Sequence, residues 1–216
     1  MTGGNGLRLR GVRIALMGRG LIAPLDASVA PGECLTLMGP SGCGKSTLLA
    51  YLAGTLDGAF EASGSVCVGD TELTGLAPER RGVGILFQDD LLFPHLSVGG
   101  NLGFALPASV RPRAARDAQI EAALVEAGLP GLAQRDPATL SGGQRARVAL
   151  MRTLLAQPRV LLLDEPFNKL DARLRNDFRD FVFDHARERA LPVLLVTHDE
   201  ADARAAGGQV ILLEAS

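Results

Sequence analysis

Two kinds of apolar pattern run along the 216-residue chain. Residues 7–14 and 64–73 alternate apolar and polar positions, which predicts strands with one solvated face, typical of an antiparallel sheet. Continuous apolar runs predict strands buried on both faces of a parallel sheet, and they occur at residues 34–38, 83–87, 160–163 and 192–197. The pattern therefore favours an α/β fold with a mostly parallel core sheet and an N-terminal antiparallel β subdomain.

Helices are expected between these strands. The predicted helices cover residues 46–52, 113–126, 142–156 and 172–189. Their sequences show apolar residues at helical spacing or a composition rich in helix-forming residues. The segment 89–137 contains five prolines and is expected to be a mostly helical insertion between two core strands. We therefore expect one domain over residues 1–216, with a helical subdomain at about 89–158.

Each of the four buried runs is followed by a residue that suits chemistry. These residues are Gly39, Gln88, Asp164 and His198. In open α/β sheets, ligands bind beyond the carboxyl ends of the strands. The four strand ends therefore indicate one shared site.

The strongest local motif is GPSGCGKST, which satisfies the P-loop pattern and lies between a predicted strand and a predicted helix. Its glycines let main-chain amides and a helix N-terminus surround a phosphate. Lys45 suits the β- and γ-phosphates, and the Ser46 hydroxyl suits Mg²⁺. The candidate nucleotide-binding residues are Gly39, Pro40, Ser41, Gly42, Cys43, Gly44, Lys45, Ser46 and Thr47.

Two further motifs fit nucleotide hydrolysis. In VLLLDE, Asp164 ends a buried strand where it can hold Mg²⁺, and Glu165 is placed to polarise an attacking water. This pattern is weak alone, because many strands end in Asp.

The other motif is LSGGQ. Ser141 is a good helix N-cap, and the following glycines expose amides at the helix start. The chain thus has two phosphate-binding helix N-termini. One nucleotide could be bound by both within a monomer, or the second could serve a neighbour's nucleotide.

Composition and charge remove other classes of function. A formal net charge of −2 argues against broad electrostatic binding of nucleic acid, so no nucleic-acid partner is expected. The chain has three cysteines, Cys34, Cys43 and Cys67, and their spacing does not match a zinc site. An odd number of scattered cysteines indicates a reducing compartment. The start lacks an apolar signal core, and no apolar run approaches membrane-spanning length. A soluble, cytosolic chain is expected.

The ordered set of GPSGCGKST, Gln88, LSGGQ, VLLLDE, NKLD and VTHD resembles the nucleotide-binding subunit of ABC transporters over nearly the whole chain. LSGGQ together with a P-loop is highly specific to this superfamily. The stretches ILFQDDLLFPHLSVGGNLGFAL and DEPFNKLD look most like importers of the thiamine, iron(III), polyamine and sugar type. The resemblance implies a P-loop NTPase of ABC type that uses ATP and Mg²⁺.

The resemblance also implies roles and partners. Two subunits would dimerise head to tail in the ATP state, so that Ser141, Gly142, Gly143 and Gln144 of one close over the γ-phosphate held by the other. Catalysis would use Lys45, Gln88, Glu165 and His198, and Mg²⁺ would be bound by Ser46, Gln88 and Asp164. Asp171 would reach across the dimer. The implied partners are integral membrane permease subunits and, indirectly, a periplasmic or extracellular substrate-binding protein. The chain would then lie as a peripheral protein on the inner face of the membrane.

Three departures from the family pattern stand out. The family stacks adenine on an aromatic residue before the P-loop, where this chain has Leu16. Asn168 and Lys169 replace the commoner small pair before Asp171. Few residues follow His198, so we expect no C-terminal regulatory domain, as in short importers of the thiamine type.

ATP hydrolysis that drives substrate import is the predicted function, and thiamine or a related small molecule is the leading candidate cargo. The alternative within the superfamily is an exporter or lipoprotein-release ATPase, against which DEPFNKLD and FPHLSV weigh. A DNA-repair ABC ATPase would insert long coiled coils that are missing here. A small-metabolite kinase would leave LSGGQ and His198 without a use.

Overall fold

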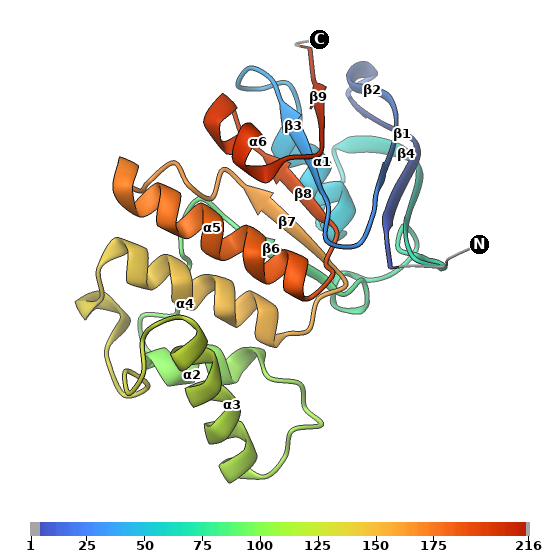
Figure 1. Cartoon of the computed structure of the whole chain (residues 1–216). Coiled ribbons are helices and arrows are strands. Elements are labelled where there is room, and N and C mark those ends of the chain that lie inside the picture. Colours follow the sequence, from blue (N-terminus) through green and yellow to red (C-terminus); the bar gives the residue numbers. More distant parts are fainter. Residues whose placement is uncertain (1–4, 215–216) are drawn as a thin grey trace. The chain divides into compact units, whose positions relative to one another are not determined.

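The computed structural model describes residues 5–214, which form two compact units (Figure 1). The first unit holds the described residues up to Ile85, the segment Arg159–Glu165 and the described residues from Arg179 onward. The second unit comprises Leu86–Pro158 and Pro166–Phe178. It therefore includes a segment after residue 158 that lies outside the range expected for the helical subdomain.

The first unit contains the antiparallel sheet that the alternating segments predict. Its strands are β1 (Leu7–Leu16), β2 (Arg19–Val29), β4 (Phe60–Val68) and β5 (Thr71–Glu72), in the order β2-β1-β4-β5. Met17 and Gly18 join β1 to β2 with positive φ angles of 51° and 77°. Two such residues between paired strands are typical of a tight hairpin turn whose twist matches the strands.

The second sheet of this unit has the order β6-β7-β8-β3-β9. Its strands are β3 (Cys34–Met38), β6 (Val83–Leu86), β7 (Val160–Asp164), β8 (Val193–Val196) and β9 (Gln209–Leu212). β3 pairs in parallel with both β8 and β9, and β7 pairs in parallel with β8. β3, β7 and β8 are buried along almost their whole length, as the continuous apolar runs predict.

The prediction for residues 83–87 is wrong in one respect. β6 alternates half-buried and buried residues, and Phe87, which follows it, is 44% exposed. β6 is an edge strand, so it lacks the second neighbour that lies beside each central strand. A continuous apolar run therefore did not mean burial on both faces here.

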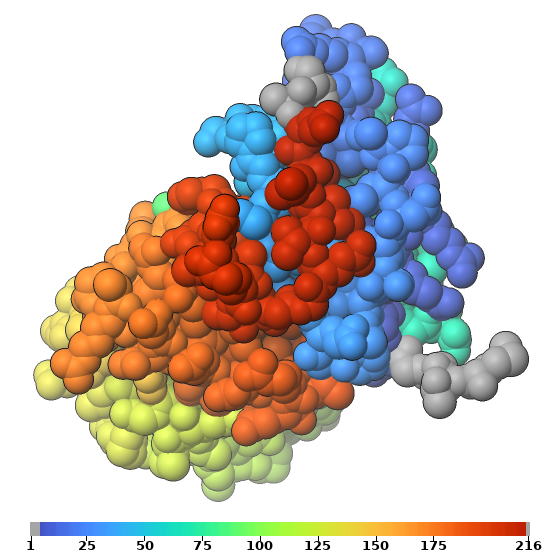
Figure 2. Space-filling model, turned by 45° about the horizontal axis from the view of Figure 1, so that its top comes forward, coloured from blue at the N-terminus to red at the C-terminus, as the bar shows by residue number. Residues whose placement is uncertain are grey.

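One apolar core joins both sheets of the first unit. Side chains of β1 and β4 pack with those of β3, β7 and β8 and with the inner face of α1 (Lys45–Ala53). The short turn η1 (Pro78–Arg80), the helix α6 (Glu200–Ala206) and the C-terminal part of α5 (Ala172–Glu188) complete the unit. The strand β9 lies beside the β1–β2 hairpin at the surface (Figures 1 and 2).

The second unit is helical. It contains α2 (Val98–Ala105), α3 (Arg113–Glu126), η2 (Pro137–Thr139), α4 (Gly142–Leu155) and the start of α5. Ser97 caps α2 by accepting from the Gly100 amide, and the buried Asn101 bonds main-chain groups at both Phe93 and Ser97. Within residues 5–214, no helix combines the length and apolar character needed to cross a membrane.

Candidate functional site

Three neighbouring strands of the parallel sheet bring most of the predicted site residues to one edge. β7, β8 and β3 are consecutive in the sheet and parallel, so their carboxyl ends meet (Figure 1). The P-loop follows β3, Asp164 and Glu165 lie at the end of β7, and His198 lies just beyond β8. These three strand ends therefore meet at one edge of the sheet, and that they form one ligand site stays a prediction.

The P-loop is shaped by glycines that no other residue could replace without strain. Gly44 has φ 93°, and a Cβ there would lie 2.8 Å from the Ile22 side chain. Gly39 has φ 156°, and a Cβ there would lie 2.4 Å from the Leu213 carbonyl oxygen. The loop is thus held between β2 and the residue after β9, where the Leu213 amide also donates to the Met38 carbonyl at 2.7 Å.

Lys45 is held inside this loop. The residue is 7% exposed, and its Nζ donates to the Gly39 and Pro40 carbonyls at 2.8 Å each. The third neighbour of Nζ is the Cys43 sulfur at 3.8 Å, which is a weak acceptor. Gly44, at the N-cap of α1, offers no side chain to cap the first amides of the helix. A cation and main-chain amides together form an anion-binding site.

Ser46 and Asp164 provide the donor set that suits Mg²⁺. The Ser46 hydroxyl donates to Asp164 Oδ1 at 3.4 Å, although the two residues are 118 positions apart. Burial raises the pKa of Asp164, and the Ser46 hydrogen bond and the Lys45 charge lower it in part. A hydroxyl and a partly buried carboxylate are hard oxygen ligands, which magnesium prefers.

Glu165 and His198 face each other at the same edge. Glu165 Oε2 lies 3.2 Å from His198 Nδ1. Glu165 has φ 48°, a left-handed conformation that is rare for a residue with a side chain and that clusters at functional sites. Its amide donates to the Val196 carbonyl at 2.9 Å, which ties it to the end of β8. A carboxylate and an imidazole in contact can hold and move a proton.

The LSGGQ motif lies in the second unit and begins α4 as predicted. Ser141 is the N-cap, and its Oγ accepts from the Gln144 amide at 3.3 Å. Gln144 Oε1 accepts in turn from the Ser141 amide at 2.9 Å, completing a capping box. Gly142 has open space around its Cα except for the Arg145 side chain. Gly142 is therefore partly accessible at this helix N-terminus, whereas Gly143 is buried.

Gln88 and Asp171 also belong to the second unit. The Asp171 carboxylate accepts from the Arg173 and Leu174 amides at 3.2 and 3.0 Å, so it caps α5 of its own chain. Its predicted reach across a dimer stays a prediction. Of the substituted pair before it, Lys169 forms an ion pair with Asp89, the residue after Gln88.

A second ion pair joins the segment after Gln88 to the LSGGQ helix. Arg145 Nε donates to Asp90 Oδ2 at 3.0 Å, and the same guanidinium donates to the Leu140 carbonyl at 2.8 Å. Sequence reasoning noted Lys169 but not its partner Asp89, and it missed Asp90 and Arg145. Opposite charges were visible in the sequence, but spacings of 55 and 80 residues gave no reason to pair them.

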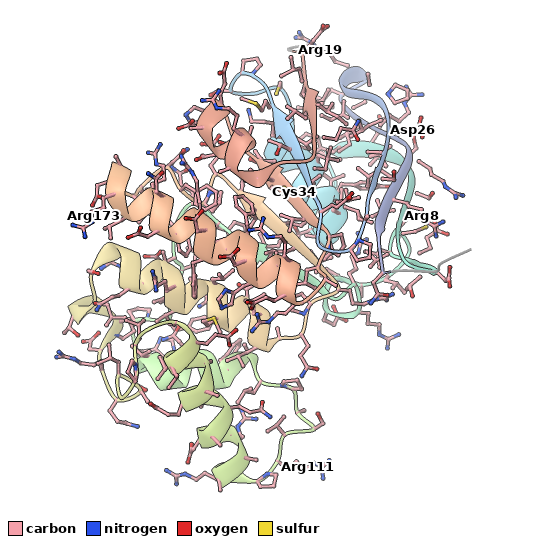
Figure 3. All side chains as sticks on the ribbon, in the orientation of Figure 1. Arg8, Arg19, Asp26, Cys34, Arg111 and Arg173 are labelled. Atoms are coloured by element: carbon pink, nitrogen blue, oxygen red, sulfur yellow. The ribbon has the colours of Figure 1, made fainter. Side chains whose placement is uncertain are left out.

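Leu16, the predicted adenine contact, lies at the end of β1 and is 37% exposed. It pairs with Arg19 of β2 and with Phe60 of β4, and Arg19 is seen at the end of the hairpin in Figure 3. Directly paired residues share a sheet face. Leu16 is on the face that carries Ile14 and its partner Ile22, the residue that packs on Gly44. Phe60, an aromatic neighbour, follows the P-loop and so was outside the sequence search.

The cysteines are free thiols. Burial raises the pKa of the Cys34 thiol to about 12, so it stays protonated at neutral pH, and Figure 3 shows its place on β3. A thiol that cannot form a thiolate is a poor nucleophile. Cys34 therefore contributes packing.

The family model described as "ABC transporter" matches residues 22–168. The uncharacterized ABC transporter ATP-binding protein YnjD of Escherichia coli K12 is 49% identical over 92% of this chain and 91% of its own length. The putative 2-aminoethylphosphonate import ATP-binding protein PhnT of Salmonella typhimurium is 41% identical over 93% of this chain. The Fe(3+) ions import ATP-binding protein FbpC 1 of Rhizobium meliloti is 41% identical over 89% of this chain. The chain spans 54% of the length of each of these last two relatives.

Proposed function

This chain belongs to the ABC transporter family as an ATP-binding subunit, an ATPase coupled to transport, and we propose that it drives import through membrane permease subunits. The observation that carries the ATPase chemistry is the gathering of Lys45, Asp164, Glu165 and His198 at one edge of the parallel sheet. The two relatives above whose names state a direction of transport are import proteins, which supports import here.

Each side chain has a role that follows from its contacts. Lys45 is positioned to bind phosphate oxygens, because an oxygen anion can replace the weak Cys43 sulfur contact. Glu165 accepts a proton from the attacking water, and its left-handed backbone directs it from the strand end. His198 stabilises charge that develops on the γ-phosphate. Positioning and electrostatics carry this reaction.

Ser46 and Asp164 are the proposed holders of Mg²⁺, with Gln88 as a further ligand. When bound there, the cation would neutralise charge on the phosphates. Asp164 and Ser46 already lie within 3.4 Å of each other, so no large movement is needed to bring their oxygens onto one ion.

We expect phosphate release from ATP by the purified chain to require Mg²⁺ and to stop when EDTA is added. Ser46→Ala should raise the Mg²⁺ concentration needed for half-maximal release by about tenfold, because one of few oxygen ligands is lost. Ser63→Ala, an exposed hydroxyl on β4, is the control and should leave that concentration unchanged. Hydrolysis that persists in EDTA would contradict the metal assignment.

The proposed assembly is a head-to-tail homodimer in the ATP state on the cytoplasmic face of the membrane. The main-chain amides that follow Ser141 begin a second helix N-terminus, and a neighbour's γ-phosphate would bind there. In the second unit, a groove of about 420 Å³ includes Asp90, Pro94, Arg145 and the exposed Leu91 in its lining. A mixed apolar and charged groove after Gln88 suits a permease loop.

Reconstitution tests the transport function. The chain, co-expressed with the permease genes nearest its own, should co-purify with them and confer ATP-dependent uptake on proteoliposomes that contain the cognate binding protein. Glu165→Gln in the same complex should bind permease but give no uptake. Uptake that does not depend on this chain, or outward transport, would overturn the import proposal.

Leu16 gives a prediction about the base. Base–aromatic stacking contributes roughly 1–3 kcal/mol in nucleic-acid binding proteins, and Leu16 has no π-face. We therefore expect weak ATP affinity and little preference over GTP, and Leu16→Tyr should tighten ATP binding by at least about fivefold. Calorimetric titration of both nucleotides measures this.

The matched control is Ala15→Tyr, which places the same ring on the opposite face of the same strand without changing charge. It should leave affinity unchanged. If Leu16→Tyr also leaves both affinities unchanged, Leu16 is only a sheet residue. Phe60, its cross-strand partner, then becomes the candidate to cover the base.

A further inference from the structure

A buried hydrogen-bond network surrounds the main chain at His198. The fully buried Thr197 donates from Oγ1 to Asp202 Oδ2 at 3.0 Å. Thr197 Oγ1 also accepts a hydrogen bond from the Asp199 amide at 3.0 Å. One hydroxyl therefore connects the residues before and after His198. The Thr197 amide donates to the Leu37 carbonyl of β3 at 3.2 Å, which fixes this turn to the sheet.

Asp202 is oriented by a cation on another helix. Asp202 lies on α6 and is fully buried, and Arg179 lies on α5 and is 7% exposed. The Arg179 Nε and one terminal nitrogen approach Asp202 Oδ1 at 2.6 and 2.5 Å. Asp202 Oδ1 thus binds the guanidinium, and Asp202 Oδ2 accepts the hydrogen bond from Thr197. A buried carboxylate without such a partner would be unfavourable.

His198 needs this support because its own ring is not held by packing. Its side chain is 61% exposed, with Glu165 at 3.2 Å on one side. An exposed ring takes its position mainly from the main chain that carries it. The main chain here is restrained by Thr197 and Asp199, which meet at one hydroxyl.

We propose that Asp202, charged and oriented by Arg179, acts through Thr197 as a positioning residue that aims His198 at the γ-phosphate. This inference rests on the role proposed above for His198. A network that merely joins α5 to α6 would stabilise the fold without affecting the histidine. The two possibilities differ in whether the effect of Thr197 depends on the His198 side chain.

Thr197→Val tests this with the least disturbance, because it removes the hydroxyl and leaves the Arg179–Asp202 pair in place. At saturating ATP we expect single-turnover phosphate release to slow by about tenfold, with ATP affinity unchanged. Thr197→Ser should restore the rate because it returns the hydroxyl. Thr36→Val is the matched control, an equally buried threonine on β3, and should keep the wild-type rate.

A double-mutant cycle with His198→Ala decides between positioning and structure. In the His198→Ala background, Thr197→Val should have no further effect on the rate. The same tenfold loss in both backgrounds would overturn the proposal while leaving the role of His198 intact. A wild-type rate for His198→Ala alone would overturn the role of His198, and the positioning proposal with it.

Asp202→Asn extends the test to the carboxylate. It leaves Arg179 without its anionic partner, so the melting temperature should fall as well as the rate. In the Thr197→Val background, Asp202→Asn should still lower the melting temperature. The rate of phosphate release of this double variant should equal that of Thr197→Val alone. A further loss of rate there would show a separate route and contradict the proposed chain of contacts. If Asp202→Asn does not fold, the Thr197 cycle alone decides.

Discussion

Glu165→Gln is expected to reduce ATP hydrolysis by about 10²- to 10⁴-fold, the usual contribution of a general base, while ATP binding persists. Glutamine has nearly the same shape but cannot take a proton from water. The side chain lies at the end of β7 beside His198, and an amide can keep a contact there. Phosphate release and nucleotide titration on the same preparation measure the two effects.

The same variant should trap the dimer. The P-loop and LSGGQ each present a helix N-terminus to phosphate, and blocked hydrolysis leaves ATP in place to join two chains. Light scattering with Mg·ATP should therefore show twice the 22.6 kDa mass of the chain. Glu79→Gln, an exposed glutamate of η1, should behave as wild type. If Glu165→Gln scatters only as a monomer, the head-to-tail assembly is wrong.

Lys45→Ala is expected to weaken ATP binding by roughly 10- to 100-fold, since hydrogen bonds to charged groups contribute about 1.5–3 kcal/mol. Lys45 meets phosphate in the ground state from a buried position in the loop. His198→Ala should keep the affinity within about twofold and lower turnover by about 10²-fold, because its contact strengthens as charge develops.

Fluorescence titration of a labelled ATP analogue and steady-state phosphate release separate these outcomes. His95→Ala provides the control, since this exposed histidine of the second unit contacts Phe93 and has no proposed catalytic role. Equal loss of binding in Lys45→Ala and His198→Ala would contradict the division between binding and turnover.

The sequence was sufficient where the determining physics is local. Burial of 160–163, the N-cap at Ser141 and the start of α1 depend on neighbouring residues, and the structure has all three. The ordered motifs predicted the family, the fold class and the ATPase activity, which the comparisons confirm. The P-loop, VLLLDE and VTHD each lie at a strand end, whereas LSGGQ begins the helix α4.

The sequence was insufficient where contacts depend on register or distant pairing. Phe60 lies beside Leu16 only through the pairing of β1 with β4. The Asp89–Lys169 and Arg179–Asp202 pairs join residues 80 and 23 positions apart. With 22 basic and 24 acidic residues in the chain, opposite charge alone could not select these partners. The edge position of β6 likewise comes from strand order, which no single run encodes.

The Leu213 carbonyl, just after the last described strand, lies so close to Gly39 that the phosphate-binding loop has no space there for a side chain. The two glycines before β9, Gly207 and Gly208, have φ angles of 65° and 75° and form its connection to α6. A protease cut in that connection would free β9 from α6, and β9 would then be held by its pairing with β3 and by the packing of Ile211 and Leu213 on the core. Disruption of the region around Leu213 is thus expected to disturb the phosphate-binding loop and to lower the affinity for nucleotide. For protein engineering, a bulky fusion is therefore better placed away from Leu213.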